Sequence, residues 1–163
     1  MFIVKWVLIA IAVVILVAIG AGQIGLFKAG VPNDIGVREG RLKPPSNTDN
    51  SVTSQAALYP DHPQRSYSTI APLALRGDGA ATLAKIKVIV EATPGALVVQ
   101  SKPDYLYAQY TTPLMKFVDD VEFWFDPAAN VVQVRSASRV GKGDMGVNRK
   151  RVEAVRAALA AAP

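Results

Sequence analysis

The hydrophobic and polar positions of this chain change period several times, and each change predicts a different element. Between residues 2 and 27 almost every side chain is apolar, and the seventeen residues from Trp6 to Gly22 carry no polar side chain. A helix of this length crosses one bilayer at about 1.5 Å per residue. Lys5 and Lys28 bracket the stretch. The pattern predicts a transmembrane anchor at residues 1–28.

A cleaved signal peptide is the main alternative to an anchor, but its apolar core is usually shorter, and Gly20-Ala21-Gly22 is a weak cleavage signal. The orientation is ambiguous. Lys5 precedes the span, whereas more positive charges lie after it, which favours a cytoplasmic domain. A short tail before the span is instead typical of a signal anchor that translocates the downstream domain. We expect a single-pass protein of a bacterial inner membrane with a periplasmic domain.

Residues 29–72 form an extended segment rich in proline, glycine, serine and asparagine, a composition that is poor in regular structure. Its short apolar pieces, such as Leu42 and Val52, are expected to lie across the domain. The remaining residues, 73–163, are expected to form that domain.

Two helices are predicted by apolar residues at spacings of three and four. The first runs from Asp78, a plausible N-cap, to Thr93, and Pro94-Gly95 ends it. The second closes the chain after Gly146. Their apolar stripes are Leu83, Ile86, Ile89 and Val90 in the first helix, and Val152, Val155 and Leu159 in the second.

Between the helices, alternating residues predict four strands, because side chains on a strand point to opposite faces in turn. The strands cover residues 96–100, 105–112, 119–125 and 131–140. We therefore predict an α+β fold, an antiparallel sheet of about four strands with two helices on one face, preceded by the transmembrane helix. The polar face of the sheet would remain open to a partner or the membrane.

The last two strands carry most of the charged residues. Keeping apolar residues opposite one another pairs Phe125 with Asn130 and Asp120 with Arg135, with Glu122 as a diagonal neighbour. An exposed ion pair of this kind is worth about 0–1 kcal/mol. The alternative is that Arg135 and its neighbours face a ligand.

The composition narrows the function classes. The net charge is +5, and without Lys5 and Lys28 the count is 16 basic to 13 acidic residues, a mild excess that does not indicate nucleic acid as a partner. Cysteine is absent, which excludes a disulfide, a thiol nucleophile and a cysteine metal site. The single histidine, His62, is expected in an exposed loop. We predict no cofactor and no metal.

A glycine-rich loop, Gly141–Gly146, leads into the last helix. Glycines before a helix N-terminus beside cations can bind an anion, and a plain turn with Asp144 or Asn148 as the cap is the alternative. The spacing lacks the pattern of a Walker loop, and the context does not suit a dinucleotide-binding fold.

Longer motifs also stand out. They are Gly36–Leu42 (GVREGRL), Ser51–Ala56 (SVTSQA), Asp119–Phe123 (DDVEF), Arg135–Gly141 (RSASRVG), Asp144 and Gly146–Glu153 (GVNRKRVE). Together they resemble the domain of unknown function 1499 family of bacteria and plastids, over about residues 34–160. Family members often have cysteines where this chain has Pro44–Ser51, so a thiol role there cannot be general. The resemblance implies a domain boundary rather than an activity.

Three functions are carried forward. The first is a non-catalytic, membrane-anchored binding module for an anionic ligand, a lipid headgroup or an envelope protein, with the membrane contacted through residues 2–27. Its candidate ligand-binding residues are Arg135, Arg139, Arg149 and Arg151, with Asp119, Asp120 and Glu122 orienting them. The second is a structural subunit or assembly factor of a membrane complex.

The third function is a hydrolase or transferase that uses the acidic cluster. Two adjacent carboxylates repel each other, which raises the pKa of one of them and allows it to act as an acid. Asp119 and Asp120 are neighbours on a strand, however, and point to opposite faces. Because no nucleophile–base pair is visible either, we assign no catalytic residue.

Overall fold

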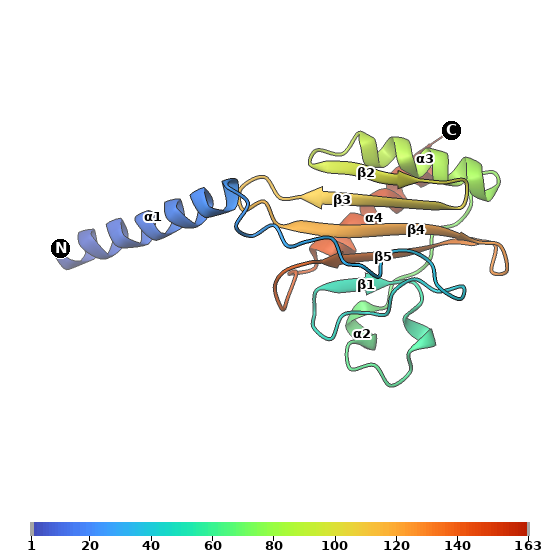
Figure 1. The fold of residues 1–163 in the computed structure, drawn as a ribbon, viewed down its shortest axis with the longest axis horizontal. Coiled ribbons are helices and arrows are strands. Elements are labelled where there is room, and N and C mark those ends of the chain that lie inside the picture. The colour runs from blue at the N-terminus through green and yellow to red at the C-terminus, as the bar shows by residue number, and fades with distance from the viewer. Residues whose placement is uncertain (1, 163) are drawn as a thin grey trace.

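The computed structural model describes residues 2–162 and contains one five-stranded sheet with two long helices behind it (Figure 1). The elements are α1 (Phe2–Gln23), β1 (Ser51–Thr53), η1 (Ala56–Leu58), α2 (Arg65–Ser68), α3 (Gly79–Glu91), β2 (Ala96–Ser101), β3 (Tyr105–Thr111), β4 (Val118–Asp126), β5 (Val131–Ser138) and α4 (Val147–Ala161). All strand pairs are antiparallel, in the order β1-β5-β4-β3-β2.

The predicted α+β class is confirmed, with five strands where about four were expected. The additional strand is β1, which lies within the proline-rich segment of residues 29–72 and pairs with β5 through Ser51 and Ala137. A three-residue strand gives too short an alternation to be recognised from sequence. Pairing with β5, rather than local propensity, holds it in place.

The main core lies between the sheet and the helices α3 and α4. Phe123 of β4 and Val134 of β5 are buried against Ile86 of α3 and Val155 of α4, as the apolar stripes predict. Asp78 caps α3, since its carboxylate accepts a hydrogen bond of 2.7 Å from the backbone nitrogen of Ala81. The core therefore fixes which side chains of each strand face the helices and which face the other way.

The register between β4 and β5 differs from the prediction by two residues. Asp126 pairs with Val131, so that Glu122, not Asp120, lies opposite Arg135. The Asp126 carboxylate accepts hydrogen bonds from the backbone nitrogens of Ala128 and Ala129, which stabilises a turn one residue further along the chain. Because the shift is an even number of residues, every side chain keeps its predicted face while the ion-pair partners change.

The polar face of the sheet is not open. Residues 29–44, which we call the strap, run across it in front of β4 and β5 (Figure 1). Leu42 of the strap is buried against Tyr105 and Tyr107 of β3. The prediction that this face is left to a partner or the membrane is therefore wrong, because the chain covers it with its own N-terminal segment.

The last turn of α1 is docked on the loop between β3 and β4. The side-chain nitrogen of Gln23 donates to the carbonyl oxygens of Pro113 (3.1 Å) and Leu114 (2.9 Å). A Cβ atom on Gly22 would lie 2.6 Å from the carbonyl oxygen of Met115. Among residues 2–162, α1 is the one helix long and apolar enough to cross a membrane, with a mean hydropathy of 3.0. These contacts therefore fix the place at which α1 joins the rest of the fold.

Gly95, in the turn between α3 and β2, provides a test of how closely this turn packs against β3. Its φ is +79°, and an added Cβ atom would lie 2.6 Å from the carbonyl oxygen of Thr111. We expect Gly95→Ala to lower the free energy of unfolding by about 1–3 kcal/mol in urea titrations of the full chain in mild detergent. Gly30→Ala is the control, since nothing lies within 4 Å of its Cβ position and its φ is outside the left-handed region. Equal stabilities of the two variants would contradict the prediction.

Candidate functional site

The seven candidate residues do not form one site. Alternation along β4 places Asp119 on the helix side of the sheet, and Asp120 and Glu122 beneath the strap. Arg135 and Arg139 lie with the latter two carboxylates. The other two candidates are Arg149 and Arg151 of α4, and they have separate partners.

Glu122 and Arg135 form a desolvated pair under the strap. Glu122 Oε1 accepts hydrogen bonds from the hydroxyl of Tyr105 (2.7 Å) and the backbone nitrogen of Gly36 (2.8 Å). Glu122 Oε2 lies 3.8 Å from Arg135 Nη1, and the two side chains are 0% and 4% exposed. Burial raises the pKa of Glu122 and lowers that of Arg135. Arg135 also donates to the carbonyl oxygen of Pro44, so that the strap closes over the pair.

A second buried pair lies beside the first. Arg139 binds Asp120 through two hydrogen bonds, Nε to Oδ2 (2.8 Å) and Nη2 to Oδ1 (2.7 Å). The hydroxyl of Tyr107 donates to Asp120 Oδ1 at 2.6 Å, and Arg139 Nη1 donates to the carbonyl oxygen of Ala29. The hydrogen bonds to Asp120 raise the pKa of Arg139. The guanidinium group of Arg139 therefore already binds groups within the chain.

The helix-side arginines are also engaged. Arg151 Nη2 lies 2.5 Å from Asp119 Oδ2, and its guanidinium carbon lies 4.6 Å from the ring centroid of Tyr110. Arg149 donates to the carbonyl oxygens of Tyr67 and Thr69. All four arginines thus hold strands, strap and helix together, and an external anion would compete with these internal contacts.

Asp144 occupies the start of α4. Its carboxylate accepts from the backbone nitrogens of Gly146 (2.9 Å) and Asn148 (3.1 Å), and from the hydroxyl of Tyr67. Burial alone would raise the pKa of Asp144, but these hydrogen bonds outweigh it and lower the pKa. The position that an anion would take at this helix N-terminus is therefore filled by the chain's own carboxylate.

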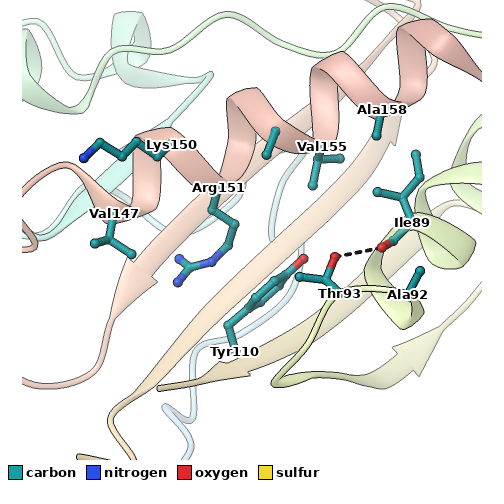
Figure 2. A pocket seen from close by; sticks show the side chains of 10 residues that line it. Ile89, Ala92, Thr93, Tyr110, Val147, Lys150, Arg151, Val155 and Ala158 are labelled. Carbon is teal, nitrogen blue, oxygen red and sulfur yellow. Dashed lines mark hydrogen bonds between the residues drawn. The ribbon is translucent and has the colours of Figure 1, made fainter. Parts of the chain in front are cut away.

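An open cleft of about 690 Å³ separates α3 from α4 above the end of β3 (Figure 2). Its lining comprises Ile89, Ala92, Thr93, Tyr110, Val147, Lys150, Arg151, Ala154, Val155 and Ala158. Figure 2 shows Tyr110 at the base and Lys150 at the rim. The cleft is thus apolar along its length and basic at one end.

The polar groups in the cleft are few. The hydroxyl of Tyr110 is buried and makes no hydrogen bond of ordinary geometry with any described residue, although Thr93 lies beside it. The Thr93 hydroxyl donates to the carbonyl oxygen of Ile89 at 2.8 Å, so its proton is already used. Because the Tyr110 hydroxyl has no partner of ordinary hydrogen-bond geometry among the described residues, a bound molecule could hydrogen-bond to it.

A family model described as "Protein of unknown function (DUF1499)" matches residues 41–159. The chain belongs to the DUF1499 family. The resemblance drawn from the motifs is thereby confirmed. No curated protein and no solved structure matches the chain. The DUF1499 match begins within the strap and includes β1, so this family's domain takes in much of the proline-rich segment.

Sequence reasoning missed the cleft of this DUF1499 chain. The apolar stripe of the first predicted helix includes Ile89, but the sequence does not show that this side chain borders an opening. A usable signal was the alanine-rich end of α4, because Ala154 and Ala158 leave space where larger side chains would close on α3. Only the placement of α3 beside α4 turns that signal into a cleft.

Proposed function

We propose that this chain is a membrane-anchored, non-catalytic module that binds an acidic amphiphile with an alkyl chain, such as a fatty acid. The observation that carries the proposal is the cleft between α3 and α4. Its volume is within the roughly 300–1,000 Å³ range of ligand sites, which are mostly apolar with a few placed polar groups. The alkyl chain would lie along Ala154 and Ala158, and the acidic group near Lys150.

Charge supports this class of ligand. Lys150 is exposed and has no ion-pair partner among residues 2–162, unlike Arg151 beside it. An acidic headgroup at the rim would therefore gain a cation without breaking an internal pair. The hydroxyl of Tyr110 would supply a further hydrogen bond inside the cleft.

The anchor supports the cellular context that we propose. An apolar α1 with the body at one end suits a single-pass protein of a bacterial inner membrane. As part of this proposal, the body lies on the periplasmic side of that membrane, in the cell envelope. Amphiphiles with an alkyl chain are abundant at such a surface.

The test uses cis-parinaric acid, a fluorescent fatty acid, with the full chain in amphipol. We expect saturable binding that Ala154→Phe weakens about tenfold or more, because the new ring fills the cleft. Ala157→Phe is the matched control, since Ala157 is also exposed on α4 but does not line the cleft. Lys150→Gln should weaken binding of the acid but not of the corresponding alcohol.

Absence of saturable binding by the folded chain would overturn the proposal. So would equal affinities of the Ala154→Phe and Ala157→Phe variants. Circular dichroism establishes that each variant is folded.

A structural subunit of a membrane complex is the second candidate, and the edge strand β2 favours it. Leu97 and Val99 of this strand are 63% and 49% exposed. Apolar side chains on a free sheet edge are a common docking surface for another chain. Co-purification from mild detergent that is lost in Leu97→Lys would favour this candidate over the first.

A further inference from the structure

The junction between the anchor and the body contains a second groove, which we call the anchor groove. It has a volume of about 380 Å³ and lies between the end of α1 and the end of β3. Its lining is Gly22, Gln23, Ile24, Gly25, Lys28, Thr111 and Lys116. The groove contains two lysines and no acidic residue.

The walls of the anchor groove are held in place. Gln23 ties α1 to the β3–β4 loop through two carbonyl oxygens, and the rings of Phe27 and Phe117 lie 5.5 Å apart between centroids. Within the loop, the backbone nitrogen of Lys116 donates to the carbonyl oxygen of Thr112 at 3.2 Å. Lys28 follows α1 and Lys116 belongs to the β3–β4 loop, so the two lysines reach the groove from two segments that these contacts hold together.

The charges in this groove are not compensated. Neither Lys28 nor Lys116 forms an ion pair with any residue from 2 to 162. This contrasts with Arg135, Arg139 and Arg151, whose carboxylate partners lie within the fold. An anion entering the groove would meet two ammonium groups that have no carboxylate partner, whereas both N–H groups of Gln23 already donate to Pro113 and Leu114.

The position of the groove relative to the bilayer indicates which kind of molecule carries that anion. The apolar helix ends at Gln23, so a bilayer that contains α1 has its headgroup layer at the residues that line the groove. Leu114 in the adjoining loop is 60% exposed, and an exposed apolar side chain beside cations is typical of a segment at a lipid interface. Lysines next to a span attract anionic headgroups.

We infer that the anchor groove binds the phosphate headgroup of an anionic phospholipid in the leaflet next to the body. Lys28 and Lys116 contact the phosphate, and the side-chain oxygens of Gln23 and Thr111 supply polar contacts to hydroxyl groups in the rest of the headgroup. The inference rests on the membrane anchorage in the proposed function but not on the α3–α4 cleft. A lipid held there would fix the tilt of the body relative to α1.

The test uses the full chain in nanodiscs with one part phosphatidylglycerol to four parts phosphatidylcholine. After transfer to detergent, native mass spectrometry counts the phosphatidylglycerol that stays bound. We expect the double variant Lys28→Gln/Lys116→Gln to retain at least about fivefold less than the parent chain. The control Lys102→Gln/Lys142→Gln removes the same charge from exposed lysines outside the groove and should retain as much as the parent.

A third variant separates geometry from charge. Gly22→Leu keeps both lysines, but its Cβ would lie 2.6 Å from the carbonyl oxygen of Met115 and force the walls apart. We expect it to lose phosphatidylglycerol as the lysine double variant does. Retention equal to that of the parent would show that charge alone is responsible and would overturn the site.

Other outcomes are equally decisive. Equal retention by the two double variants would overturn the inference, and displacement of the lipid by inorganic phosphate would show a site for the free anion instead. A chain that does not enter nanodiscs would overturn both the inference and the proposed anchorage. We expect Lys28→Gln/Lys116→Gln to bind cis-parinaric acid as the parent chain does. This result would show that the anchor groove and the α3–α4 cleft bind their ligands independently.

Discussion

The Glu122→Gln variant is expected to unfold with a free energy about 3–5 kcal/mol lower than that of the parent chain. Glutamine keeps the shape of the side chain and can still accept from Tyr105 and Gly36. It removes the negative charge beside Arg135, whose side chain is 4% exposed and whose guanidinium group stays protonated. The cost is that of leaving a charge buried without its counter-charge. Urea titration of the full chain in mild detergent, followed by circular dichroism, measures it.

A double variant tests the cause. Adding Arg135→Met to Glu122→Gln removes the uncompensated charge, so we expect it to recover part of the lost stability. The control is Glu153→Gln, which breaks the Arg156–Glu153 pair on the surface of α4, where Glu153 is 49% exposed. It should cost about 0–1 kcal/mol. A Glu122→Gln loss no larger than that of the control would show that the buried pair does not support the fold.

Alkaline unfolding is the second large effect. Burial raises the pKa of Tyr105, Tyr107 and Tyr110 above the ordinary value of 10.0. The unfolded chain loses these protons above about pH 10, whereas the folded chain retains them. The stability that depends on these protons is complete below that pH and falls as the pH rises towards the folded values. Each tyrosine contributes a loss of up to about 1.4 kcal/mol per pH unit.

The measurement follows tyrosinate absorbance and circular dichroism together from neutral pH upwards. Three of the five tyrosines are the buried ones, so we expect most of the tyrosinate signal to change in one step with circular dichroism, because these three hydroxyls ionise only when the structure opens. Tyr110→Phe should leave stability at neutral pH unchanged or higher, since that hydroxyl has no ordinary hydrogen bond within the described chain. It should also make the alkaline loss less steep. Gradual ionisation of all three tyrosines in a chain that remains folded would contradict the prediction.

The elements whose hydrophobic pattern repeats several times along the chain were predictable from sequence. The stripe through Ile86 and Val90 placed α3, Asp78 marked its start, and the alternation around Phe123 fixed which side chains of β4 face the helices. In each case the signal is local and repeats several times. The seventeen apolar residues from Trp6 likewise placed α1.

Pairings between distant segments were not predictable. The partner of Arg135 depends on the register of a turn, and hydrophobic alternation cannot distinguish registers that differ by two residues. The strap carries few regular signals, so nothing in its composition shows that it returns across the sheet. The contact between Asp119 and Arg151 joins a strand to a helix and requires their placement in space.

The strap also bears on how the chain is made. Ala29 is synthesised 110 residues before Arg139, and Gly36 is synthesised 86 residues before Glu122. The strap therefore emerges beside the anchor long before the strands that it covers, and contacts so far apart in sequence form late. In a chain that stops before β5, the strap and the side chains of Tyr105 and Tyr107 would be exposed to proteases. The strap can close only after Arg139 has been made, and the core is complete only after α4 has followed it, because Val155 of α4 is part of that core.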